Sequence, residues 1–135
     1  MSVVVAENGQ GRYQQAVTVG QHHLIADEPV SVGGADAGPA PFDLIMAGLG
    51  ACTSMTLRMY AERKGLALTH VSVALRHEKT TVDGVARDHI ERTISLTGEL
   101  TAEQRQRLLE IANKCPVHRA LSSSMIIESA LATRE

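Results

Sequence analysis

Two cysteines, Cys52 and Cys115, are the residues of this chain best suited to chemistry. A cysteine thiolate is a nucleophile and a metal ligand, and two thiols that meet in a fold can cycle through a disulfide. Their separation in the sequence decides nothing alone, because pairing in space depends on the fold. Three interpretations stay open on these residues: two thiols that only pack, half of a metal site, or a catalytic pair.

The two cysteines have different predicted surroundings. Cys52 follows the apolar run LIMAGLGA within a predicted helix, about three turns past its start, where the helix dipole no longer stabilises a thiolate. A positive side chain would have to do so; otherwise Cys52 is an ordinary buried cysteine. Cys115 directly precedes Pro116, at a predicted helix N-cap, where free amide donors and the dipole favour an anion. Local physics therefore favours Cys115 over Cys52 as the thiolate.

Metal and phosphate binding both lack residues that they need. Cys115 and His118 have the spacing of half a zinc site, but a structural site takes four ligands and there is no second such pair. The glycine-rich loop over residues 33–38 lacks the Lys and the Ser or Thr of a phosphate-binding loop, and Asp36 would repel a phosphate. We expect no metal and no cofactor.

Arginines and one acid complete the candidates. Arg12, Arg58 and Arg119 could each hold a thiolate anionic, or be solvated surface residues. Asp43 lies in the first turn of the predicted central helix and most simply complements its dipole. It precedes Cys52 by nine residues, so a straight helix places the two on opposite sides, about 13 Å apart along the axis.

The elements that must position these residues indicate an α+β fold. Short strands are expected within residues 2–26, then a Gly- and Pro-rich loop from Asp27 to Pro41, then a helix over Pro41–Lys64 that Gly65 ends. The first half of that helix is apolar on every side and carries Gly48 and Gly50. Such a segment must be enclosed all round by other chain.

The second half of the chain predicts a hairpin and two more helices. Apolar residues alternate on both sides of Asp83-Gly84, a typical hairpin turn; they are Val71, Val73, Leu75, Ile90, Ile94 and Leu96. Thr101 with Gln104 is a capping box for a helix through about Asn113, and Pro116 begins a short third helix. Met125–Leu131 is predicted as a final strand.

Length and composition bound the remaining possibilities. The 135 residues suit a single domain over 1–135, and a net charge of -2 with only Tyr13, Phe42 and Tyr60 to stack on bases argues against a nucleic-acid partner. No apolar run approaches the roughly 18 residues of a membrane helix, and the start has no leader pattern. We expect a cytoplasmic protein, where cysteines seldom form standing disulfides.

Three segments give the chain a family resemblance. They are Asp27-Glu28-Pro29, GGADAGPAPFDLIMAGLGACTSMTLRMYAERKG over residues 33–65, and KCPVHRALS over residues 114–122. The chain resembles the family of osmotically inducible protein C and the organic hydroperoxide resistance proteins (OsmC/Ohr), over nearly its whole length. This resemblance implies an OsmC-like fold with antiparallel sheets and a long buried central helix, in an interlaced homodimer.

The resemblance also implies roles for the candidate residues. Cys52 would attack an organic hydroperoxide and Cys115 would resolve the product as a disulfide, which a dithiol or a lipoyl-bearing protein would reduce. Arg12 stands at about the place of the family's activating arginine. Asp43, or Phe42 beside it, stands where the family commonly has a glutamate. The alternative is a redox-silent dimer of the same fold that binds a small apolar molecule.

Overall fold

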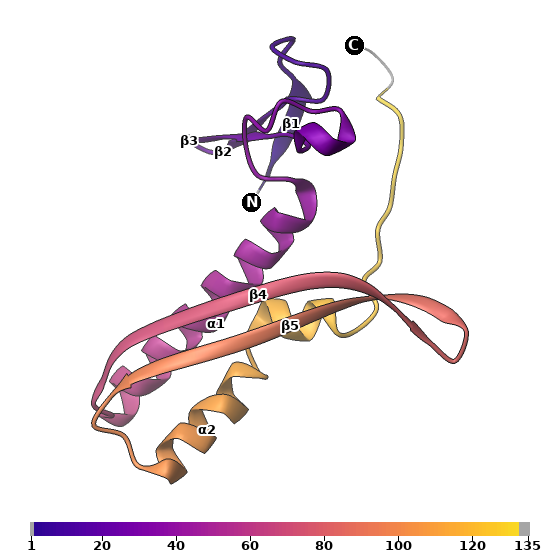
Figure 1. Cartoon of the computed structure of the whole chain (residues 1–135). Helices are drawn as coiled ribbons and strands as arrows, with labels where there is room; N and C mark the ends of the chain where they lie inside the picture. The colour runs from indigo at the N-terminus through magenta and orange to yellow at the C-terminus, as the bar shows by residue number, and fades with distance from the viewer. Residues whose placement is uncertain (1, 133–135) are drawn as a thin grey trace. The chain divides into compact units, whose positions relative to one another are not determined.

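The computed structural model describes residues 2–132 and has an α+β architecture (Figure 1). Three short strands, β1 (Val4–Glu7), β2 (Gln15–Val19) and β3 (His22–Ala26), form one antiparallel sheet in that order. Two long strands, β4 (Leu68–Val82) and β5 (Val85–Gly98), form a second sheet. The helices are α1 (Pro41–Lys64), α2 (Ala102–Ala112) and α3 (Pro116–Leu121), with a 3-10 turn η1 over Val30–Val32. The predicted fold class is confirmed.

The chain divides into two compact units, and neither is one continuous segment. The first unit comprises the residues up to Gly48 together with Arg76–Ile90. The second comprises Leu49–Leu75 together with the chain from Glu91 onward. Helix α1 and both strands of the β4–β5 hairpin therefore contribute residues to each unit. No helix within residues 2–132 is long and apolar enough to cross a membrane.

The glycine-rich loop of the first unit is organised by the buried carboxylate of Asp27. This carboxylate accepts hydrogen bonds from the backbone N–H groups of Glu28 (2.8 Å), Ala35 (3.1 Å) and Ala37 (3.1 Å). The N–H of Ala37, more than the other two, lowers the pKa of the carboxyl group, against an opposing effect of burial. A Cβ at Gly34 would clash with the Glu28 carbonyl, so the loop closes only around a glycine.

Helix α1 has the bounds that the sequence predicts. Pro41 occupies its first turn, and the Asp43 carboxylate accepts a hydrogen bond from the Ala40 N–H at 3.0 Å. Gly65, with a φ of +68°, ends the helix in the left-handed conformation that glycine adopts without strain. The buried residues of the helix recur at helical spacing along one face; they are Leu49, Thr53, Leu57, Tyr60 and Ala61.

The apolar first half of α1 is only partly covered within this one chain. A Cβ at Gly50 would lie 2.8 Å from the Leu75 side chain, so β4 approaches this glycine closely. Gly48 faces open space, and Ile45 is 39 % exposed. The expected enclosure of this segment on every side is thus not provided by the described residues of a single chain.

The β4–β5 hairpin has the predicted turn, and apolar residues of both strands pack against a core that α1 and α2 form. Asp83 and Gly84 form the two-residue turn with φ values of +51° and +77°, as such hairpins require. The core cluster joins α1 to α2 and is flanked by apolar residues of β4 and β5; its buried members are Leu57, Tyr60, Leu108, Ile111 and Ala112. Two predicted elements, the hairpin and the central helix, therefore meet α2 in one core.

The last part of the chain confirms two helices and corrects one strand. Thr101 and Gln104 form the reciprocal capping box, and Pro116 begins α3. The predicted strand over Met125–Leu131 is wrong, because residues 124–132 have no regular secondary structure. Ile126 is 91 % exposed, and a strand forms only where a neighbouring strand takes up its backbone groups and packs its side chains.

Candidate functional site

The second unit brings the two cysteines together. Cys52 lies on α1 and is half-buried, whereas Cys115 is fully buried as the N-cap residue of α3. The Cys115 sulfur accepts a hydrogen bond from the backbone N–H of His118 at 3.3 Å. Cys115 is also among the neighbours that lower the pKa of the Cys52 thiol. Both thiols are free.

Cys52 is the thiol whose pKa the surroundings lower. Burial alone would raise this pKa, but three hydrogen bonds outweigh it: from the backbone N–H of Val117, from the side chain of Cys115 and from Thr56. The positive charge of Arg92 lowers the pKa further. Cys115 accepts a backbone N–H at the start of α3, as the sequence predicts, and the Val117 N–H of the same helix start acts on Cys52.

Arg92, on β5, is the cation of this cluster. Its guanidinium donates to the Thr53 hydroxyl at 3.0 Å, to the Ala112 carbonyl at 3.3 Å and to the Asn113 side-chain oxygen at 2.8 Å. These acceptors lie on α1 and at the end of α2, so one side chain ties the strand to two helices. Burial lowers the pKa of His118, and the positive charge of Arg92 lowers it further, so the neutral imidazole is favoured.

Thr53 connects Arg92 to the cysteines. The side chain is fully buried, and its hydroxyl donates to the Leu49 carbonyl one turn earlier at 2.7 Å. The same oxygen accepts from Arg92 and lies 3.9 Å from the Cys115 sulfur. The cluster of Cys52, Thr53, Arg92 and Cys115 is hereafter called the cysteine cluster.

The other candidate residues have contacts of their own. Arg12, in the first unit, stacks on the Tyr13 ring with its guanidinium carbon 5.0 Å from the ring centroid. Asp43, also in the first unit, caps the start of α1 as described above. Arg58 donates to the Leu68 carbonyl at 2.6 Å, and Arg119 is exposed on α3. The roles of Arg12 and Asp43 at Cys52 stay predictions.

Phe42, the residue beside Asp43 at the expected acid position, makes an aromatic contact. Its ring stacks on that of His77, with the centroids 4.0 Å apart and the planes within 8°. His77 is itself hydrogen-bonded to Asp88 at 2.9 Å. Phe42 thus packs on the hairpin residues of the first unit.

Arg92 and Thr53 are not among the site residues predicted from the sequence, although the pattern around each contains a signal. Arg92 shares the strand parity of Ile90, Ile94 and Leu96, so it is a charge on the apolar face of the hairpin. Thr53 stands four residues after Leu49, as a hydroxyl within the buried stripe of α1. A polar side chain on a buried face needs a hydrogen-bond partner, and Arg92 and Thr53 are hydrogen-bonded to each other.

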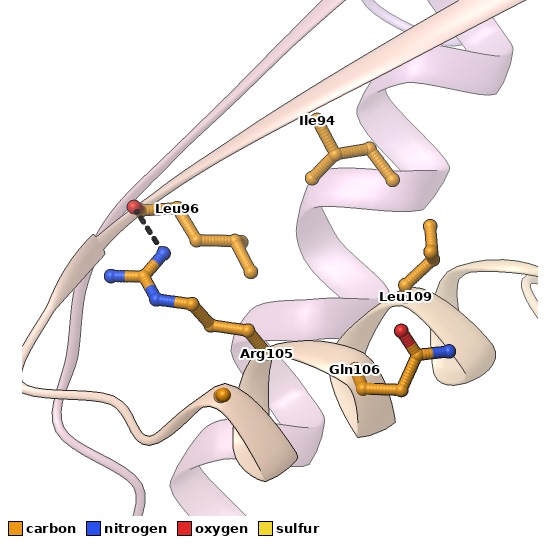
Figure 2. A pocket seen from close by; sticks show the side chains of 6 residues that line it. Ile94, Leu96, Arg105, Gln106 and Leu109 are labelled. Carbon is orange, nitrogen blue, oxygen red and sulfur yellow. Dashed lines mark hydrogen bonds between the residues drawn. The ribbon is translucent and has the colours of Figure 1, made fainter.

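A separate pocket lies between β5 and α2 (Figure 2). It has a volume of about 410 Å³ and is lined by Ile94, Leu96, Ala102, Arg105, Gln106 and Leu109. The Arg105 guanidinium lies along its wall and donates to the Leu96 carbonyl at 3.0 Å, the contact drawn in Figure 2. The pocket therefore combines an apolar wall with one positive charge.

Fold and site together define a class of protein: an α+β chain in which a cysteine of the long helix meets the N-cap cysteine of a later short helix. Residues 33–130 match the model of the family described as OsmC-like protein. The chain therefore belongs to the OsmC-like protein family, which confirms the resemblance drawn from its motifs.

Solved structures of other proteins show the same fold. An OsmC-like protein from Mycoplasma pneumoniae has a TM-score of 0.75 at 17% identity, over 90% of this chain and 86% of that one. An organic hydroperoxide resistance protein OsmC from Legionella pneumophila has a TM-score of 0.68 at 22% identity, over 89% and 87%. An organic hydroperoxide resistance protein from Elizabethkingia anophelis has 0.66 at 20%, over 87% and 84%. No curated protein matches the chain.

Proposed function

We propose that this protein is a thiol peroxidase that reduces organic hydroperoxides to alcohols with Cys52 and Cys115. The observation that carries the proposal is the meeting of the two cysteines in one cluster, where the Thr53 oxygen lies 3.9 Å from the Cys115 sulfur and Cys115 is among the neighbours that lower the pKa of the Cys52 thiol. A thiolate that already contacts a second thiol can be oxidised and then closed into a disulfide with little movement. The names of the Legionella and Elizabethkingia proteins, which share the fold, point to the same substrate class.

The chemistry balances with two cysteines and one external reductant. The Cys52 thiolate attacks the terminal peroxide oxygen, the O–O bond breaks, and the alkoxide takes a proton and leaves as an alcohol. Cys52 is now a sulfenic acid. Cys115 attacks its sulfur, hydroxide leaves and becomes water, and a disulfide forms. A dithiol, either small or on a lipoyl-bearing protein, supplies two electrons to restore both thiols.

Exposure and charge support this order of the cysteines. Cys52 is half-buried and can meet a substrate, whereas Cys115 is 0% exposed and suits an internal resolving role. Arg92 contributes positive charge at the Cys52 sulfur. Arg12 and Asp43 are proposed as a further arginine and acid that reach the site, as the family resemblance implies.

The partly covered helix supports a homodimer. Met55 and Met59 lie near Cys52 along α1 and are 59% and 62% exposed, which is unusual for large apolar side chains on a long helix. A second copy of the chain covering this face would also border Cys52. We propose that the active protein is a cytoplasmic dimer of this kind.

The pocket between β5 and α2 favours a second candidate function. A redox-silent protein could hold a small apolar molecule there, with its cysteines serving only to pack. Its apolar lining from Ile94, Leu96 and Leu109 supports that alternative. Oxidation of the cysteines by peroxide distinguishes the two functions.

The test treats the reduced protein with one equivalent of cumene hydroperoxide. Mass spectrometry should find both thiols converted to one intramolecular disulfide, which a dithiol reverses. Cys52→Ser should abolish peroxide consumption, whereas Cys115→Ser should consume one equivalent and stop at the sulfenic acid. Exchanged phenotypes would reverse the two roles, and intact thiols in the wild type would favour the binding protein.

A further inference from the structure

We infer that the pocket between β5 and α2 binds a small amphipathic carboxylate, whose apolar body packs on the pocket wall and whose negative charge pairs with Arg105. All the residues that line this pocket belong to the second unit, and none of them belongs to the cysteine cluster. Binding of such a ligand therefore does not depend on the reaction of the cysteines with a peroxide.

Two faces of helix α2 meet other parts of the second unit. One face is buried in the core through Leu108, Ile111 and Ala112. The residues of the other face recur at a spacing of three or four, which places them on one side of a helix; they are Ala102, Arg105, Gln106 and Leu109. This second face lies opposite Ile94 and Leu96 of β5 and leaves a pocket of about 410 Å³. Small-molecule sites have volumes of about 300–1,000 Å³, so the pocket is large enough for one.

The wall of the pocket keeps apolar surface in contact with water. Leu109 is 48% exposed, and Ile94 and Leu96 are only half-buried although both also pack against the core cluster. In Figure 2 these three side chains extend into the same space from α2 and from β5. A ligand with an apolar body would remove this surface from water, which favours its binding.

The charge of Arg105 is not neutralised by a carboxylate. Its guanidinium donates to two neutral carbonyl oxygens, of Leu96 at 3.0 Å and of Gly98 at 3.4 Å. Glu99 borders a neighbouring hollow together with Arg105. Even so, no acid among residues 2–132 forms an ion pair with this arginine. The pocket therefore presents one positive charge that a ligand can pair.

One positive charge beside an aliphatic wall defines the class of ligand. A guanidinium has five N–H donors, and the two carbonyls leave three of them for a carboxylate, whose planar pair of oxygens matches their geometry. No acidic residue lines the pocket, and the Gln106 amide is its other polar side chain. A cation would be repelled by Arg105. A sugar would leave hydroxyl groups unpaired against Ile94, Leu96 and Leu109.

The test measures the binding of octanoate to the reduced protein by isothermal titration calorimetry, without peroxide. Octanoate should bind at one site per chain. It should bind at least about tenfold more tightly than 1-octanol, an uncharged chain of the same length, a difference equivalent to about 1.4 kcal/mol. Octylammonium, which has the opposite charge, should bind more weakly than either.

Arg105→Met removes the charge and keeps an apolar side chain on the wall. It should weaken octanoate binding at least about tenfold and change 1-octanol binding little. Arg107→Met is the matched control, because Arg107 lies two residues further along α2, borders a different hollow and forms an ion pair with Glu110 at 3.0 Å. This control should leave octanoate binding unchanged.

A second variant guards against poor folding of Arg105→Met, which also removes two hydrogen bonds to the backbone. Leu109→Glu places a negative charge on the wall at a half-exposed position, where substitutions seldom unfold a protein, and should abolish octanoate binding. In the wild type, octanoate should shift the amide NMR signals of β5 and α2 around the pocket. Those around the exposed Met55 and Met59 of α1 should move less.

The absence of octanoate binding, or equal affinities for octanoate and 1-octanol, would overturn the inference. Unchanged octanoate binding in Arg105→Met or in Leu109→Glu would do the same, as would the largest NMR shifts at Met55 and Met59. Because no measurement uses peroxide, cysteines that oxidise in a protein that does not bind octanoate would refute this inference alone. Octanoate binding by a protein with inert cysteines would refute the peroxidase proposal alone.

Discussion

Replacing Arg92 with methionine tests whether the cation of the cysteine cluster stabilises both the fold and the thiolate. The substitution removes three hydrogen bonds with a charged donor, each worth about 1.5–3 kcal/mol when its acceptor is buried. The Asn113 oxygen is exposed, so water replaces that bond, and two bonds count. Methionine on the apolar face beside Ile94 regains about 1 kcal/mol.

The net destabilisation of Arg92→Met is therefore about 2–5 kcal/mol, or roughly 6–15 °C in the melting temperature of a chain of this size. The pKa of Cys52 should rise, because a charge that lowers it is gone. A thiolate rate increases with pH as the thiol ionises, so the variant should consume peroxide more slowly at neutral pH. Its rate should approach that of the wild type at alkaline pH.

The assay is a pH series of peroxide consumption under a dithiol, with thiolate titration and thermal unfolding of the same samples. Arg105→Met is the matched control, because Arg105 also donates to two carbonyls, of Leu96 and Gly98, but lies on the wall of the separate pocket. Arg12→Met, measured in parallel, tests the arginine that the family resemblance implies. An unchanged pH profile in Arg92→Met, or an equal change in Arg105→Met, would refute the role given to Arg92.

Two further predictions concern the loop and the dimer. Asp27→Asn should lower the melting temperature at neutral pH, because an amide nitrogen cannot accept the hydrogen bonds that the carboxylate accepts from the Ala35 and Ala37 N–H groups. The folded protein lowers the pKa of Asp27, so the wild type loses this stability as acid protonates the carboxyl group. The melting temperatures of the wild type and the variant should therefore converge below about pH 4. Met59→Asp should convert the proposed homodimer into monomer in sedimentation velocity, and a wild type that already sediments as a folded monomer at micromolar concentration would contradict the dimer.

Local signals in the sequence were sufficient for most of the secondary structure. Pro41, Gly65 and the Thr101–Gln104 pair act on their own backbone neighbours, so the limits of α1 and the start of α2 could be predicted. Asp83-Gly84 fixed the hairpin turn in the same way. Met125–Leu131 failed because β propensity needs a neighbouring strand, and composition alone does not say whether one is present.

The cysteine cluster could be predicted only in part. Both cysteines are identified by residue type and by the family motifs, but two of the groups that lower the pKa of Cys52, Cys115 and the Val117 N–H, lie at the start of α3, far away in the sequence. A helix dipole acts on its own helix end, so sequence alone does not indicate that the Val117 N–H of α3 acts on a cysteine of α1. Apolar alternation predicts the strand of Arg92 but does not show which partner a charge on its apolar face will meet.

The division of the chain into interleaved units has a consequence for synthesis. The first unit is complete only after Ile90 has been made, and by then Leu49–Leu75 of the second unit has already been synthesised. Segments of the two units alternate along the chain, so the two units cannot fold one after the other in the order of synthesis. For the same reason no single cut releases either unit as a fragment, and limited proteolysis in the hairpin should compromise both together.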